Sequence, residues 1–295
     1  MLAIRTGVLA GFFMCSVMTG AFAQALAQNV AATEAITAKT DGKRKINLSG
    51  RQRMLSQYMA KAVCFANLRV DEKLQLDELQ VAHHLFERTL VELRDGSPVQ
   101  RMLPEEDLKI NTALDEVEKV WYVYGKAVKV RDMVAVVDQN LAVLSKSNDV
   151  VTLFQKKYGA ADTVAPEIAA ALNVSGRQRM LTQKASKEFC LVASGMDGTG
   201  NRTALKATLE LFDKSMAGLK DGSAELGLGA APSKAIIDQI GKVNDAWTPM
   251  KAIFGKVAEG GAPSPEDVAA ISKQNVAVME AANVIVGLYE AAGAK

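Results

Sequence analysis

The sequence predicts an all-α protein that consists of two tandem four-helix up-down bundles related by pseudo-two-fold symmetry. The first observation is a repeat: residues 47–57 read NLSGRQRMLSQ and residues 173–183 read NVSGRQRMLTQ, with nine of eleven positions identical. A repeat of this quality decides the architecture before any single element is considered. The second observation is composition, because only 5% of the residues are aromatic, and the abundant Ala, Leu, Met, Lys and Glu favour helices over strands.

The repeat extends far beyond this motif at an offset of 126 residues. It pairs Lys61 with Lys187, Cys64 with Cys190, Phe86 with Phe212, Gly96 with Gly222 and Trp121 with Trp247. Lys146 and Asn148 align with Lys273 and Asn275 at an offset of 127, which predicts one inserted residue before them. We therefore expect a first domain at residues 24–160 and a second at residues 161–295.

The N-terminal residues have the pattern of a secretory signal peptide at residues 1–23. Arg5 precedes an apolar run, and a small-x-small cleavage site ends at Ala23. Cleavage after Ala27 is a second possibility, and an uncleaved anchor over residues 6–23 is a third. Cleavage predicts a periplasmic protein, and no later stretch is apolar enough to span a membrane in the mature chain.

The first repeat is expected to begin with small, polar residues at 24–41 that are poorly ordered or loosely helical. Four helices follow, with expected limits at 46–70, 71–94, 104–130 and 132–158. The second of these ends because Gly96 and Pro98 are helix-stop signals. The third begins at Pro104, which three acids follow near the positive end of the helix dipole.

The second repeat follows the same plan. We expect its helices at 165–196, 202–220, 233–258 and 264–292. The last one opens with Ser264, Pro265 and Asp267, which supply a cap, a proline at the first helical position and an acid three residues after the cap. Four antiparallel helices return the chain to its starting end, and the link between the bundles is short. The two motif helices should therefore run parallel.

The repeated motif places an unusual set of side chains around Arg53. At 100° per residue, one helical face carries Arg53 together with Gly50, Ser49 and Gln57. A glycine inside a helix costs about 1 kcal/mol relative to alanine, and it is kept where another backbone or a ligand comes close. The second copy carries the same set, Arg179, Gly176, Ser175 and Gln183. These eight residues are the candidate anion-binding residues.

The motif Asn-x-Ser-Gly-Arg-Gln-Arg-Met-Leu-Ser-Gln resembles the P-box of the periplasmic sensor domains of NarX-type nitrate/nitrite sensor kinases. It is still more similar to the N-terminal domain of PilJ-type chemoreceptors of type IV pili, and the similarity covers both copies. In the nitrate sensors, the arginine before the methionine comes from each subunit, and the two arginines hold one small anion. The resemblance implies this role for Arg53 and Arg179 within one chain. The family's receptors continue into a transmembrane helix and a cytoplasmic signalling region, and neither is recognisable in this sequence.

We therefore expect an exported, sensor-like protein that binds a small inorganic anion, nitrate or nitrite first, between its two repeats. Two guanidiniums about 5 Å apart repel by roughly 3 kcal/mol at an effective dielectric constant near 20, and a planar oxyanion replaces this repulsion by fork-like contacts. A membrane receptor or transporter is the expected partner, and no catalytic or cofactor motif occurs. The alternative is a non-catalytic structural or adaptor bundle of the cell envelope or type IV pilus system, in which Arg53 donates a salt bridge.

Cys64 and Cys190 each follow the motif arginine by eleven residues, and equivalent positions on parallel helices lie at equal height. We expect either a disulfide between them, which an oxidising periplasm permits, or two buried free thiols. Arg51 and Arg177 point about 160° away from the motif arginines, so we expect them to pair with acids or solvent.

Three further patterns limit the function. His83 and His84 are adjacent, so they cannot converge on one metal ion, and we predict no metal site. A formal net charge of +2 gives no support for nucleic-acid binding. Trp121 and Trp247 are expected to anchor the core of each bundle.

Overall fold

The computed structural model describes residues 36–160 and 162–292, which contain eight α-helices. They are α2 (Ala38–Asn67), α3 (Glu72–Asp95), α4 (Leu108–Val130), α5 (Met133–Tyr158), α6 (Pro166–Ala193), α7 (Gly198–Asp221), α8 (Lys234–Ala258) and α9 (Pro265–Ala291). The all-α prediction with two four-helix segments is confirmed. The predicted signal peptide at 1–23 lies outside the described residues. The residues from Ala38 onwards form one compact unit, and the domain limits at 160 and 161 stay a prediction.

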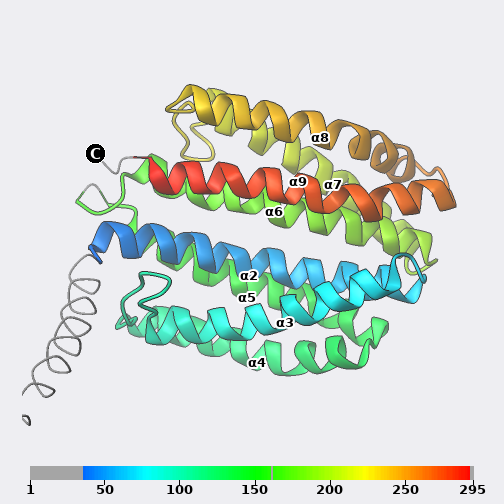
Figure 1. Ribbon diagram of the computed structural model, residues 1–295, viewed down its shortest axis with the longest axis horizontal. Helices are drawn as coiled ribbons and strands as arrows, with labels where there is room; N and C mark the ends of the chain where they lie inside the picture. The colour runs from blue at the N-terminus through cyan, green and yellow to red at the C-terminus, as the bar shows by residue number, and fades with distance from the viewer. Residues whose placement is uncertain (1–35, 161, 293–295) are drawn as a thin grey trace, which may run out of the picture. The chain divides into compact units, whose positions relative to one another are not determined.

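The two motif helices, α2 and α6, lie side by side at the centre of this unit (Figure 1). In the first repeat α3 and α5 pack on α2, and in the second α7 and α9 pack on α6. The contacts between α2 and α6 advance in the same direction along both helices, from Asn47 with Arg179 to Cys64 with Cys190. The two helices therefore run parallel, as the sequence predicts.

Central placement makes α2 and α6 buried on nearly every side. Between Lys45 and Ala66, only Arg51 is not fully buried. Many of these buried side chains are polar, and most buried polar groups in proteins are hydrogen-bonded. The central seam is consequently polar, while the apolar core lies between each motif helix and its own three helices. The predicted anchors Trp121 and Trp247 are there, each stacked on a phenylalanine at a centroid distance of 4.1 Å.

Helix α2 begins at Ala38, eight residues before the expected start at residue 46. A buried charge cluster holds these additional turns. Lys45 Nζ lies 3.3 Å from Asp41 and 3.1 Å from Glu105, and Tyr158 donates to Asp41 at 2.7 Å. These partners come from distant parts of the chain, so local sequence could not reveal them.

Helix α4 begins at Leu108 rather than at Pro104. Asp107 is the cap, because its side chain accepts from the backbone N–H of Lys109 at 2.8 Å. Glu105 does not belong to the first turn of the helix, where the sequence predicts it, because its buried carboxylate pairs with Lys45 and Lys157. A tertiary ion pair therefore overrides the local start signal.

The register between α5 and α9 also differs from the prediction. Lys187 Nζ donates to Asn140 Oδ1 at 2.9 Å, and Lys61 Nζ donates to Asn275 Oδ1 at 3.2 Å. Asn275 is therefore the counterpart of Asn140, and the alignment of Asn148 with Asn275 was wrong. A longer connection between α8 and α9 than between α4 and α5 contributes to the additional shift.

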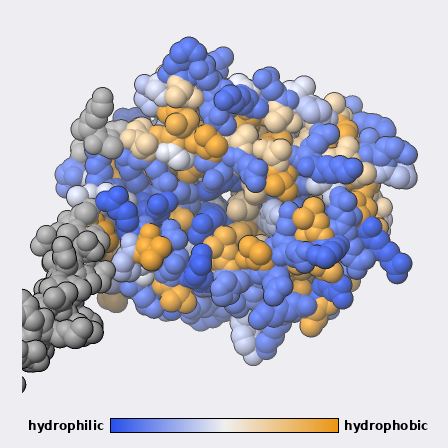
Figure 2. All heavy atoms as spheres, in the orientation of Figure 1, coloured by the Kyte–Doolittle hydropathy of each residue, from blue (hydrophilic) through white to orange (hydrophobic). Residues whose placement is uncertain are grey.

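The surface of the face that carries α2, α3 and α9 is largely hydrophilic, with apolar side chains in separate patches (Figure 2). Among the described residues, no helix combines the length and apolar character needed to cross a bilayer.

Candidate functional site

Arg53 lies at the seam between the two repeats and is only 1% exposed. Its Nη2 donates to the backbone oxygen of Asn173 at 3.1 Å and to Asn173 Oδ1 at 2.8 Å. Its Nη1 donates to Asn148 Oδ1 at 2.9 Å. The guanidinium of the first repeat is thus held by the motif asparagine of the second repeat and by α5 of its own.

Arg179 makes the reciprocal contacts and is 2% exposed. Its Nη2 donates to the backbone oxygen of Asn47 at 3.3 Å and to Asn47 Oδ1 at 2.9 Å. Its Nη1 donates to Asn283 Oδ1 at 2.7 Å. These are the contacts that pseudo-two-fold symmetry predicts, with Asn283 as the counterpart of Asn148.

All of these acceptors are neutral amides. Within residues 36–160 and 162–292, neither Arg53 nor Arg179 has a carboxylate within salt-bridge distance, and the Nε of each is buried without a hydrogen-bond partner. Buried charges are ordinarily paired with an opposite charge. The site therefore holds two uncompensated positive charges and spare donors.

The motif glycines make room for the two guanidiniums. A Cβ on Gly176 would lie 3.2 Å from Arg179 Nη2 and 3.9 Å from Arg53 Nη2. A Cβ on Gly50 would lie 3.4 Å from Arg53 Nη2 and 3.9 Å from Arg179 Nη2. Both guanidiniums therefore converge on the space beside these two residues, where a Cβ would be tight at Gly176 and in ordinary contact at Gly50.

Burial is the main cause that lowers the pKa of both arginines. It lowers the pKa of Arg53 to about 9, with further repulsion from Arg177 and then from Arg179. It lowers the pKa of Arg179 to about 10, with repulsion from Arg51 and a smaller opposing effect of Glu290. Both values lie above neutral pH, so both guanidiniums are charged there. An anion at this position would relieve their unfavourable burial.

The predicted serines do not contact the guanidiniums by a hydrogen bond. Ser49 Oγ donates to the Lys45 carbonyl at 2.7 Å, and Ser175 Oγ donates to the Leu172 carbonyl at 3.3 Å. Their hydroxyl hydrogens are thus used inside their own helices, and their role in anion binding stays a prediction.

The predicted glutamines lie one turn further along the seam. Gln57 Oε1 accepts a hydrogen bond from Lys187 Nζ at 3.1 Å, whereas Gln183 Oε1 is buried without a partner among the described residues. The structure therefore places Gln57 with a second pair of cations, Lys61 and Lys187, and its role in anion binding stays a prediction, as does that of Gln183.

Lys61 and Lys187 form this second pair of buried cations, which sequence reasoning did not assign to the site. Burial lowers the pKa of each to about 8. Lys61 retains one carboxylate nearby, Glu78, at 4.0 Å. The signal in the sequence was their exact repetition two turns after the arginines.

Cys64 and Cys190 close the far end of the seam. They form a disulfide with a Cα–Cα distance of 6.2 Å, which lies within the normal range for this bond. Of the two expected alternatives, the structure has the disulfide. This covalent bond connects the two repeats about three helical turns from the arginine pair.

Arg51 differs from its expectation, whereas Arg177 is partly exposed and agrees with the expected alternative of solvent. Arg51 Nη2 donates to Thr89 Oγ1 at 2.9 Å rather than to an acid. Arg177 lines a groove together with Arg53, and among the described residues its guanidinium has no hydrogen-bond or ion-pair partner. The prediction considered only the helix that carries each arginine, whereas Arg177 faces Arg53 across the seam.

No metal centre is indicated, because the described residues contain no group of three or more His, Cys, Asp or Glu side chains that could hold a metal ion. His83 packs on Trp121 with ring centroids 4.8 Å apart and lies 3.4 Å from Glu87.

Comparison with known proteins identifies the family of the chain and a similar chemotaxis protein. Residues 35–150 and 161–273 match the type IV pili methyl-accepting chemotaxis transducer N-terminal domain, PilJ. The methyl-accepting chemotaxis protein McpN of Pseudomonas aeruginosa is 30% identical over 129 residues, which are 44% of this chain and 23% of McpN. The aligned region thus spans less than a quarter of that relative. Since the two matched segments make up most of the sequence, the chain belongs to the PilJ family and carries its N-terminal sensor domain in two tandem copies.

Proposed function

We propose that this protein is an exported, periplasmic sensor domain that binds one small inorganic anion, nitrate or nitrite, between Arg53 and Arg179. The observation that carries the proposal is the meeting of two buried arginines, one from each repeat, without a carboxylate among their described partners. In a two-chain sensor such a pair forms only at a dimer interface. Here the tandem repeat supplies both arginines in a fixed arrangement.

The anion is proposed to lie beside Gly50 and Gly176, where the two Nη2 groups converge. A planar oxyanion accepts charge-assisted hydrogen bonds from both guanidiniums, which are stronger than bonds to neutral amides. The amide side chains of Asn47 and Asn173 then become free to turn towards other partners. Arg53 also lines a surface groove, and we propose that an anion enters the seam from that side.

A periplasmic location and a membrane partner belong to the same proposal. The disulfide between Cys64 and Cys190 supports an oxidising compartment, because cytosolic disulfides are rare. McpN is a methyl-accepting chemotaxis protein, which supports a sensory role. We propose that a membrane receptor or transporter receives the ligand or the signal, and that no catalysis is involved.

Thermal unfolding in a chloride-poor buffer tests this proposal. The melting temperature should rise with the logarithm of the nitrate concentration, because a ligand that binds only the folded state stabilises it. Arg53→Ala and Arg179→Ala should each remove the rise. Lys61→Met, which removes another buried cation of the same helix, should retain it. A rise that persists in both arginine variants, or no rise in the unmodified protein, would overturn the proposal.

The second candidate is the structural bundle, in which the arginines only connect the two repeats. It is favoured by one observation: each guanidinium already has three hydrogen bonds to amide oxygens of the protein. Under this reading Arg53→Ala lowers stability, and nitrate has no effect on any variant. The thermal experiment therefore separates the two candidates.

A further inference from the structure

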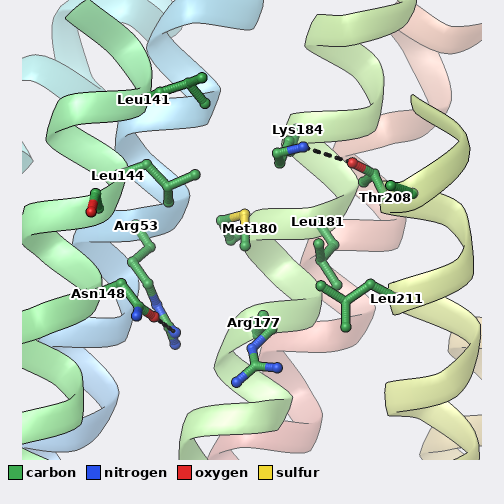
Figure 3. Close-up of a pocket in the computed structure, with 12 residues that line it drawn as sticks. Arg53, Leu141, Leu144, Asn148, Arg177, Met180, Leu181, Lys184, Thr208 and Leu211 are labelled. Atoms are coloured by element: carbon green, nitrogen blue, oxygen red, sulfur yellow. Dashed lines mark hydrogen bonds between the residues drawn. The ribbon is translucent and has the colours of Figure 1, made fainter. Parts of the chain in front are cut away.

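A groove of about 460 Å³ lies between α5, α6 and α7, on the face of the unit opposite α3 and α9. Its volume is within the range of small-molecule sites and far exceeds that of nitrate. The side chains that matter for its chemistry are Arg53, Arg177, Leu144, Met180, Leu181 and Leu211 (Figure 3). The groove therefore combines basic and apolar groups.

Two arginines form one end of the groove. In Figure 3 the guanidiniums of Arg53 and Arg177 lie on opposite sides of that end, with Asn148 beside Arg53. Among all charged groups, Arg177 has the largest effect on Arg53, because the two cations repel each other. Arg177 has no hydrogen-bond partner among the described residues, so its donors are available to a ligand.

Arg177 does not make the contact that its counterpart in the first repeat makes. In the first repeat Arg51 donates to Thr89 Oγ1 at 2.9 Å. The position equivalent to Thr89 at the offset of 126 is Ser215, whose Oγ is buried without a partner. Arg177 therefore points into the groove instead of bonding α7, and the two repeats are not equivalent here.

The remainder of the groove is mostly apolar, with Ser145, Lys184 and Thr208 as its polar residues. Leu144 of α5 and Leu211 of α7 face each other across Met180 and Leu181 of α6 (Figure 3). Leu141, at the rim, is 61% exposed. The third cation of the groove, Lys184, is already paired with Glu188, so the uncompensated charge is confined to the arginine end.

The equivalent groove of the first repeat has the opposite character. It is lined by Met54, Leu55 and Leu85, the counterparts of Met180, Leu181 and Leu211. It contains Asp77 and Glu78 and no basic residue. Apolar walls are thus common to both grooves, whereas the positive end belongs to the groove of α6 alone, which makes it specific for an anion.

We propose that the groove between α5, α6 and α7 binds a small organic monoanion with an apolar body, such as a branched-chain carboxylate. The carboxylate lies between Arg177 and Arg53, and the apolar body packs on Leu144, Met180 and Leu211. This site shares only Arg53 with the proposed nitrate site, and its existence does not depend on that proposal.

Isothermal titration calorimetry of the full chain with 4-methylpentanoate and with its neutral amide tests the site. The carboxylate should bind with a stoichiometry of one molecule per chain. The amide should bind at least about tenfold more weakly, because it lacks the charge that strengthens each hydrogen bond. Arg177→Ala should weaken carboxylate binding by about tenfold or more. Arg51→Ala, the matched variant of the first repeat, should change it less than about twofold.

Leu141→Asp provides a second test, because it adds a negative charge to an exposed position at the rim and should weaken the carboxylate without affecting folding. Nitrate-dependent stabilisation should persist in Arg177→Ala, because Arg177 is not part of the proposed nitrate site. Failure of the nitrate proposal can therefore be distinguished from failure of the carboxylate proposal. No saturable binding of 4-methylpentanoate up to about 10 mM, equal binding of acid and amide, or equal losses in Arg51→Ala and Arg177→Ala would overturn the inference.

Discussion

Arg53 of the first repeat donates to both the backbone and the side-chain oxygen of Asn173, the residue that begins the motif in the second repeat. Arg179 likewise donates to both the backbone and the side-chain oxygen of Asn47. Each copy of the motif therefore completes the other copy. This exchange explains why asparagine, glycine and arginine recur together in both copies: the asparagine accepts, the glycine leaves space, and the arginine crosses the seam.

Removal of Arg53 should destabilise the fold as well as the anion site. We expect Arg53→Ala to lower the free energy of unfolding by about 2–4 kcal/mol, because three hydrogen bonds are lost and buried amide oxygens lose their donor. A double-mutant cycle with Asn173→Ala, followed by urea unfolding, should give a coupling energy of about 1–3 kcal/mol.

The control for this cycle is Arg88→Ala, whose side chain is half exposed and lies 3.8 Å from Glu92. It should change stability by less than about 0.5 kcal/mol. Additive effects of Arg53→Ala and Asn173→Ala would mean that the contact across the seam contributes nothing.

The disulfide should be a large source of stability. Cys64 and Cys190 are separated by 126 residues, and closing a loop of this length removes unfolded-state entropy worth about 5 kcal/mol in the chain-entropy model. Cys64→Ser with Cys190→Ser should therefore lower the free energy of unfolding by about 3–5 kcal/mol. Urea midpoints with and without reductant measure this effect. A midpoint that reductant leaves unchanged would contradict it.

Stability should increase as the pH rises from about 8 towards 10. The folded-state pKa values of Lys61 and Lys187 are lowered from 10.5 to about 8 by burial. In this window the unfolded chain binds protons that the folded chain has released, so a higher pH favours folding. Above this window the effect reverses, because burial raises the pKa of several tyrosines and the unfolded chain ionises them first; these are Tyr58, Tyr124, Tyr158 and Tyr289.

Urea unfolding at pH 7.5, 8.5 and 9.5 measures the predicted rise. Lys61→Met should remove somewhat less than half of it, because Lys187 still titrates in this window and so does Arg53, whose pKa burial lowers to about 9. An equally steep rise in Lys61→Met would show that other groups cause it.

Gly176→Ala should impair anion binding more than it impairs folding. The new Cβ would press on Arg179 Nη2 at 3.2 Å, whereas the same change at Gly50 meets Arg53 Nη2 at 3.4 Å, an ordinary contact. The gain in helix propensity, up to about 1 kcal/mol, offsets part of the strain. Nitrate titrations should therefore show a greater loss for Gly176→Ala than for Gly50→Ala, with urea midpoints close to each other. The opposite order would contradict the packing argument.

The sequence was informative where the two repeats determine each other. The identity of the motif predicted that α2 and α6 run parallel and in register, and this register brings Cys64 to Cys190. It also brings Arg53 and Arg179 to the same space beside Gly176. Capping residues such as Ser264 set helix limits that depend only on local chemistry, and these limits were predicted to within a few residues.

The prediction failed where contacts between distant segments decide the outcome. Lys45 and Glu105 form a buried pair that extends α2 and delays α4. The register of Asn148 was misjudged because a longer loop precedes α9 and the offset of the earlier helices was carried forward, although QNLAV at residues 139–143 recurs as QNVAV at residues 274–278. Arg177 was not predicted as a site residue, because the prediction used only its position on α6 and not the neighbouring helix α2.

The central claim, that two repeats supply one arginine each to a single anion site, is tested most directly by the stoichiometry of nitrate binding. Isothermal titration calorimetry in a chloride-poor buffer should give one nitrate per chain. Arg53→Ala and Arg179→Ala should each weaken binding by about tenfold or more, because charge-assisted bonds are lost in either case. Two nitrates per chain, or binding that survives the loss of either arginine, would contradict the claim.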